Sequence, residues 1–223
     1  MSLTHWLGVL GSLLPFVAAA AQPLTSSQVD PKDLNKLVKE RYDGKTFVIA
    51  TPGLLAGEYE KAEFGIGSGR AGLVLFHFHD SVDPLPKNVS TPGELLTKSI
   101  SKLNRLDDRT FTDLKSGLNV TKLEKGEQVR VNKFYMRGNY VDLFLEPLDP
   151  AHLKDLDYNK ASRKSTTLFG GGQTQTNVQV AGFGLRCLFF FDKEKVIDAG
   201  DLNAITEEIG KYVLPGSEAE KLK

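Results

Sequence analysis

The sequence predicts a mainly β protein of the α+β class: a small SH3-like barrel or antiparallel sheet region flanked by an N-terminal and a C-terminal helix. Three observations support this class. Apolar residues recur at helical spacing near the start and end of the chain, in residues 31–42 and 201–214. Between them lie runs rich in β-branched and aromatic residues, many with alternating polarity. Turns rich in glycine and proline separate these runs.

Both predicted helices have recognisable ends. Asp30 suits the N-cap of the first helix, Pro31 its first position, and Asp43-Gly44 its end. The second helix spans residues 201–214 and ends before Pro215-Gly216. Each carries one apolar stripe, made in the first of Leu34, Leu37, Val38 and Tyr42, and in the second of Leu202, Ile205, Ile209, Tyr212 and Val213.

Strands are predicted in both halves of the chain. In the first half they cover residues 45–50, 58–66 and 71–80, followed by a proline-containing loop over 81–94 and an ambiguous segment over 95–106. In the second half, residues 120–145 form a hairpin around Gly138-Asn139, entered through a turn at Gly126. A long polar connection follows over 147–176 and includes Gly170–Gly172. A strand over 178–192 is expected to be covered on both faces at Leu188–Phe191.

Residues 1–21 have the layout of a secretory signal peptide: a short head, an apolar stretch too short to span a bilayer, and alanines before the cut. We predict cleavage between Ala21 and Gln22, and an exported protein that is periplasmic or extracellular. The head lacks Lys and Arg, which leaves an uncleaved anchor or a buried N-terminal helix as the alternative. No second apolar stretch approaches membrane length, so no membrane span is expected in the mature chain.

The expected organisation is a signal peptide (1–21), an N-terminal helix with a β region (22–116), a barrel-like region with the C-terminal helix (117–214) and a flexible tail (215–223). The two central parts are also compatible with packing as one domain. Lys plus Arg and Asp plus Glu both number 28, and this balance argues against a nucleic-acid partner. The single cysteine, Cys187, lies in an apolar run and is expected to be a buried, inert thiol.

Segment Leu34–Ile49, which contains Tyr42-Asp43-Gly44-Lys45-Thr46, resembles the opening of a group of uncharacterised exported bacterial β-rich proteins with a small barrel. Residues 123–131 and the terminal strand and helix resemble other segments of the same group, so the resemblance covers about a third of the chain. It implies an exported compartment and a barrel, and no known activity. Gly44-Lys45-Thr46 is not a phosphate-binding loop, because the upstream glycine of that motif is missing and the segment runs from helix to strand.

One pair of residues has metal-ligand character. His77 and His79 are expected to project from the same face of a strand, where a His-x-His pair can hold zinc. A catalytic zinc needs a third ligand, and His152 lies in a polar segment with no indication that it returns to the strand. The favoured interpretation is therefore two histidines at a solvated strand end, with no metal and no cofactor; a metal site at His77 and His79 is the alternative.

Other candidate groups are better explained without catalysis. Adjacent carboxylates at Asp107-Asp108 and Glu207-Glu208 point apart on a helix or loop, so they are expected to be solvated charges. Asn88-Val89-Ser90 and Asn119-Val120-Thr121 match the N-glycosylation acceptor, which matters only in a eukaryotic secretory protein. The aromatic pairs and triplets are expected to fill the core, with Tyr135 and Tyr140 as the exposed pair; they are Phe76/Phe78, Phe134/Tyr135, Tyr140/Phe144 and Phe189–Phe191.

The function expected from the sequence is that of an exported, non-enzymatic binding or accessory protein for a partner protein or an envelope ligand. Export, neutral charge and the lack of convergent reactive groups support it. Two alternatives remain open. One is a metal-dependent hydrolase that uses His77 and His79, and the other is a carrier of lipid or another hydrophobic ligand near Phe189–Phe191.

Overall fold

The computed structural model describes residues 28–62, 73–82, 103–105, 109–114, 117–156, 161–167 and 173–217. The predicted signal peptide, the Asn88 acceptor, the Asp107-Asp108 pair, Gly170–Gly172 and the end of the predicted tail lie outside these residues. So do residues 63–66 of one predicted strand and most of the ambiguous segment 95–106.

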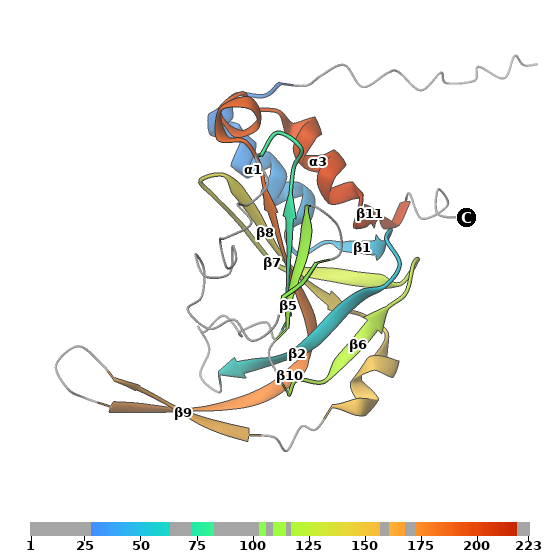
Figure 1. Cartoon of the computed structure of the whole chain (residues 1–223), viewed down its shortest axis with the longest axis vertical. Coiled ribbons are helices and arrows are strands. Elements are labelled where there is room, and N and C mark those ends of the chain that lie inside the picture. Colours follow the sequence, from blue (N-terminus) through green and yellow to red (C-terminus); the bar gives the residue numbers. More distant parts are fainter. Residues whose placement is uncertain are drawn as a thin grey trace, which may run out of the picture.

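The described chain is mainly β with a few helices, and this confirms the predicted fold class. Its eleven described strands belong to one sheet that curls strongly, as Figure 1 shows. The main path runs β11 (Val213–Pro215), β1 (Thr46–Ile49), β7 (Gln128–Arg137), β8 (Tyr140–Pro147), β10 (Gln173–Phe190), β3 (Leu73–Phe78), β5 (Thr110–Leu114), β4 (Leu103–Arg105). Off this path, β2 (Leu54–Ala62) pairs with β10 and with β6 (Val120–Leu123), and β9 (Ala161–Thr167) pairs with β10. Strands from both predicted central parts thus share one sheet, and the boundary between residues 116 and 117 stays a prediction.

Helices α1 (Pro31–Tyr42) and α3 (Leu202–Gly210) lie next to each other against one face of the sheet, which we call the helix face (Figure 1). Asp30 caps α1 as predicted, since its carboxylate accepts a hydrogen bond from the Lys32 amide at 3.0 Å. The buried stripes of both helices join the helix-face side chains of the strands in one large core. No helix among the described residues is long and apolar enough to cross a membrane.

The opposite face of the sheet, called here the second face, carries a smaller aromatic cluster. Phe76, Phe78 and Leu188 are buried there, and the side chains packed around them are only partly buried; they are Val74, Val82, Phe111, Tyr140 and Phe190. Successive side chains of a strand alternate between the faces. Phe189 therefore enters the helix-face core while Phe190 points to the second face. The predicted cover on both faces of Leu188–Phe191 is confirmed, because three of these four side chains are buried.

The predicted hairpin is also confirmed. Strands β7 and β8 pair in antiparallel register from Val129↔Pro147 to Arg137↔Tyr140, with Gly138 and Asn139 between them. Gly126 precedes β7 in a turn with φ of +86°, a left-handed conformation that favours glycine. Val129 and Val131 follow it and are fully buried, as the alternating pattern predicts.

Two predictions about the second half are wrong. The segment 147–176 is not a plain connection, because it contains the 3₁₀ helix η1 (Pro150–Asp155) and strand β9, and β10 begins at Gln173. Figure 1 shows β9 and the start of β10 as an arm at one end of the molecule. Apart from Ala161 and Val178, the paired residues of this arm are polar, so hydrophobic periodicity carries no signal for it.

The predicted C-terminal helix over 201–214 is too long. Helix α3 ends at Gly210, and Val213–Pro215 form β11, which pairs antiparallel with β1 through Val48↔Leu214. The prediction is wrong because the apolar residues continue at helical spacing through Val213, whereas the edge of β1 with which Val213 and Leu214 pair is distant in the sequence. Pro215 therefore belongs to the sheet and not to the predicted tail.

Cys187 is completely buried in the helix-face core, as predicted. Burial raises the pKa of its thiol well above the ordinary range, with a smaller contribution from the negative charge of Asp142.

We expect the thiol of Cys187 in the folded protein to react with less than a tenth of an equivalent of a charged thiol reagent, and the guanidinium-unfolded protein to react with one equivalent. Fast reaction of the folded chain would show that β10 opens locally.

Candidate functional site

The polar groups that converge most closely in the described chain lie between strand β3 and helix α3. Strand alternation places Leu73, Leu75 and His77 on the helix face, and His77 is the last of these before the strand ends. In α3, Glu208 falls between Ile205 and Ile209 in the buried stripe. A carboxylate in an apolar stripe must find a partner in the core, because burial of an unpaired charge is costly.

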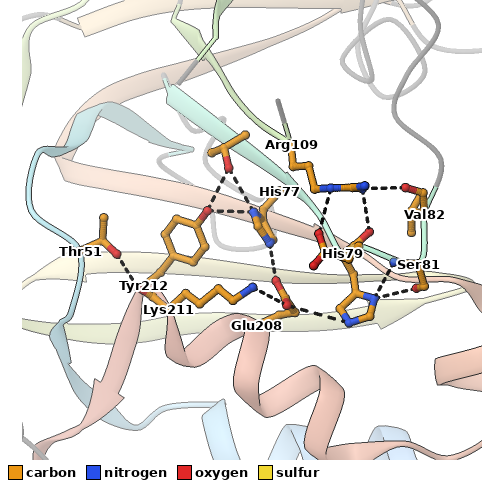
Figure 2. A network of polar contacts seen from close by, with 11 residues as sticks. Thr51, His77, His79, Ser81, Val82, Arg109, Glu208, Lys211 and Tyr212 are labelled. Carbon is orange, nitrogen blue, oxygen red and sulfur yellow. Dashed lines mark hydrogen bonds and ion pairs between the residues drawn. The ribbon is translucent and has the colours of Figure 1, made fainter. Parts of the chain in front are cut away.

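His77 and Glu208 form that pair. The distance between Nε2 of His77 and Oε2 of Glu208 is 2.5 Å, and the two side chains are 9% and 8% exposed. Lys211 approaches the other carboxylate oxygen, Oε1, with its Nζ at 2.6 Å. Figure 2 shows the carboxylate between the imidazole and the ammonium group. The prediction that Glu208 is a solvated charge is wrong, whereas its neighbour Glu207 is exposed as expected.

The far side of the His77 ring faces two hydroxyl groups. Its Nδ1 lies 2.8 Å from the hydroxyl of Tyr212 and 3.1 Å from that of Thr110, and these two hydroxyls are 3.1 Å apart. Tyr212 is held in place by its backbone, because its carbonyl accepts a hydrogen bond from the Ala50 amide at 2.8 Å. The rings of Tyr212 and Phe189 contact the imidazole at centroid distances of 5.2 and 5.8 Å.

The protonation of this network follows from Glu208. Burial raises the pKa of its carboxyl group, but the hydrogen bonds and charges of Lys211 and His77 outweigh burial, so the pKa lies below its usual range. An ionised carboxylate only accepts hydrogen bonds. His77 Nε2 therefore carries a hydrogen and donates it to Glu208.

His79 approaches the same carboxylate from the end of β3. Its Nε2 lies 3.9 Å from Glu208 Oε1, which confirms that His77 and His79 project from one face. The expectation that both lie at a solvated strand end is wrong, because His77 is buried under α3 and Tyr212. Its Nδ1 accepts a hydrogen bond from the Ser81 amide at 3.2 Å and lies 2.6 Å from the Ser81 hydroxyl. Nδ1 is thus an acceptor, so the ring hydrogen sits on Nε2 and points towards Glu208.

The turn that holds His79 and Ser81 is tied down by Arg109. Its guanidinium donates to the carbonyls of Val82 at 2.8 Å and His79 at 3.3 Å (Figure 2). It also forms an ion pair with Asp80 at 2.9 Å. A serine nucleophile needs the imidazole to take its proton. Nδ1 of His79 already accepts a hydrogen bond from the Ser81 amide. The contact between His79 and the Ser81 hydroxyl is therefore part of a local turn and not a nucleophile–base pair.

The same residues decide whether a metal could bind. Two imidazoles and one carboxylate are a known ligand set, and the sequence pointed to His77 and His79 without their partner. However, Lys211 occupies one oxygen of Glu208 and would repel a cation. Among the described residues no group of three or more His, Cys, Asp or Glu side chains is arranged to hold a metal.

His152, the third histidine considered as a ligand, has other partners. Its Nε2 lies 2.6 Å from Glu127 Oε1 and its Nδ1 lies 2.6 Å from the Thr121 hydroxyl, and the side chains of His152 and Glu127 are 14% and 13% exposed.

The side-chain amide of Asn119, in the second glycosylation acceptor, donates a hydrogen bond to Glu58 at 2.5 Å. Sugar attachment would replace this contact, since the amide nitrogen is the atom that is modified.

The second face offers a different kind of surface. Tyr135 on β7 is 51% exposed, which confirms half of the predicted exposed pair, while Tyr140 is half-buried and contacts the Phe190 ring at 5.6 Å. Cross-strand register places Lys133, Tyr135 and Arg137 opposite Phe144, Asp142 and Tyr140. Residues directly opposite in a ladder share a face, so these three exposed side chains lie on the second face. Of the three, Arg137 is opposite Tyr140, which lies at the edge of the aromatic cluster.

The chemistry-bearing residues that the sequence missed are Glu208, Tyr212 and Thr110. Only Glu208 left a signal, as a charge within the apolar stripe of a helix. The comparisons add no family to this description, because no family model, no curated protein and no solved structure matches the chain.

Proposed function

We propose that the chain is an exported, non-enzymatic binding protein for an envelope ligand, and that the ligand contacts the second face of the sheet around Tyr135. The observation that supports this most is the exposure of Tyr135, 51%, on β7, whose partner strand β8 carries Tyr140 of the aromatic cluster. Large exposed aromatic side chains next to an apolar cluster are typical of interaction surfaces. The export itself rests on the predicted signal peptide.

The buried network supports a structural rather than a catalytic role for its residues. A general acid or base must reach the proton that it transfers. His77 and Glu208 are less than a tenth exposed, and both nitrogens of His77 and both oxygens of Glu208 have partners within the chain. The network connects β3, β5, α3 and the segment before β11, so it fastens the C-terminal helix to the sheet.

We expect Tyr135→Ala to weaken binding to an envelope glycan at least tenfold without changing the melting temperature. Removal of an exposed aromatic anchor takes away contact area with the ligand but little packing within the fold. The measurement is co-sedimentation of purified protein with insoluble peptidoglycan. Leu153→Ala is the matched control, because Leu153 is also an exposed apolar residue, 41%, and lies on η1. Equal binding by the two variants, or no binding by the parent protein, would contradict the proposal.

A metal-dependent hydrolase is the second candidate, supported by the approach of both His77 and His79 to Glu208. If the chain is a binding protein, we expect it to carry less than a tenth of an equivalent of zinc, manganese or iron by elemental analysis after purification without chelators. About one equivalent of metal that disappears in His79→Ala would favour the hydrolase. His152→Ala is the control, since its partners are Glu127 and Thr121.

A further inference from the structure

We propose that the ligand of the second face is a linear anionic polysaccharide that lies along strand β7, bound by Lys133, Tyr135 and Arg137. This inference rests on the proposed binding function and names its ligand class. We call these three residues the β7 stripe.

The geometry of the β7 stripe suits an extended polymer. Its members occupy alternate positions of one strand and therefore project from the same face. Two residues of a strand span about 6.7 Å, so the Cα atoms of Lys133 and Arg137 are about 13 Å apart, with that of Tyr135 halfway between them. The order along the strand is cation, aromatic ring, cation, and all three side chains are exposed.

The positive charge of the β7 stripe is not balanced within the described part of the chain. Asp142, the acid opposite Tyr135, is held by Arg186 through contacts of 3.0, 3.1 and 2.5 Å. Glu146 accepts hydrogen bonds from the Tyr59 hydroxyl and from the Asn132 amide. Both nearby acids thus have other partners, and within the described residues no carboxylate oxygen lies within 4.0 Å of Lys133 or Arg137.

This charge is local, since the whole chain has 28 basic and 28 acidic residues. Nucleic acids and anionic membranes are bound by broader basic surfaces with a net positive charge. A single row of cations around a tyrosine fits a narrower partner, in which carboxylate or sulfate groups pair with Lys133 and Arg137 and a sugar ring stacks on Tyr135.

A protective role for the strand edge explains only part of the pattern. Residues 132–137 of β7 pair with β8 alone among the described strands, and charged side chains on such an edge prevent it from joining other chains. That role accounts for Lys133 and Arg137. It does not account for Tyr135, because an exposed aromatic side chain on an edge favours association instead of preventing it.

The test measures binding of the purified mature protein to polygalacturonate and heparin by isothermal titration calorimetry, with dextran as the neutral polymer. We expect binding to both anionic polymers, none to dextran, and at least a tenfold loss when sodium chloride rises from 50 to 300 mM. The double variant Lys133→Gln/Arg137→Gln should bind at least tenfold more weakly than the parent. The matched control is Lys36→Gln/Arg41→Gln, which removes the same charge from exposed positions of α1 and should bind like the parent.

The remaining outcomes overturn the inference. Equal weakening by the two double variants would show a non-specific charge effect, and equal affinity for single-stranded DNA or for vesicles of anionic lipid would assign the stripe to another class. If the Lys133→Gln/Arg137→Gln variant aggregates but binds the anionic polymers with unchanged affinity, the two cations only protect the strand edge. If peptidoglycan binding depends on Tyr135 but neither anionic polymer binds, the ligand class is wrong and the proposed function stands; if nothing binds, both are wrong.

Discussion

Glu208→Ala is expected to lower the free energy of unfolding by about 3 kcal/mol at neutral pH. The substitution leaves His77 Nε2–H without its acceptor inside the core and removes the partner of Lys211. A buried donor without a partner pays its full desolvation cost, and α3 loses its polar attachment to β3. Chemical denaturation of the parent and variant measures the difference.

The control is the neighbouring residue. Glu207 lies on the same helix, has the same chemistry and is exposed, so Glu207→Ala should change the unfolding free energy by less than about 0.5 kcal/mol. Glu208→Gln should fall between the two variants, because an amide can still accept from His77 but cannot pair with the Lys211 charge. A loss in Glu208→Ala no larger than that in Glu207→Ala would show that the network does not fasten α3 to the sheet.

The contribution of Glu208 also depends on pH. Its pKa is lowered in the folded state, so the ionised carboxylate stabilises the fold fully above the unfolded carboxyl pKa of about 4.3. This stabilisation is lost as the pH falls through the lower, folded pKa. The difference in unfolding free energy between the parent and Glu208→Gln should therefore narrow as the pH falls below about 4. A difference that grows between about pH 5 and pH 3 would have the wrong sign.

Local sequence patterns predicted the elements whose signals are themselves local. The cap at Asp30, the Gly138-Asn139 hairpin and the burial of Cys187 each depend on a few neighbouring residues and a clear apolar or turn pattern. The arm of β9 and β10 and the short strand β11 were not predicted. In these elements long-range pairing overrides weak local preference.

The candidate site shows the same limit. The His77 and His79 pair was recognised because strand alternation alone places both on one face. Its partner, Glu208, is 131 positions away, and the hydroxyl of Tyr212 is 135 positions away. No local pattern relates such distant residues, so only the helix stripe containing Glu208 could have indicated that this carboxylate is buried.

Gly184→Ala is expected to destabilise the fold by about 3 kcal/mol, the upper end of the usual cost of overpacking a core. A Cβ atom at this position of β10 would lie 2.3 Å from Cζ and 2.8 Å from Cε2 of Phe144. The phenyl ring has little room to move aside, because Phe144 is only 8% exposed and packs edge-on against Tyr59 at 5.0 Å. Thermal and chemical denaturation measure the cost, and Gly216→Ala is the control because nothing lies within 4 Å of a Cβ there.

A double-mutant cycle with Phe144→Leu identifies the cause of this cost. A shorter side chain at position 144 removes the ring atoms that the new methyl group would meet. Gly184→Ala should therefore cost at least about 1.5 kcal/mol less in the Phe144→Leu background than in the parent. Equal costs in both backgrounds would place the strain in the backbone of β10 instead of the Phe144 contact. In that case Gly184 would be required by the curl of the sheet, where β10 stops pairing with β2, at Gly184↔Gly57, and begins to pair with β8, at Leu185↔Leu145.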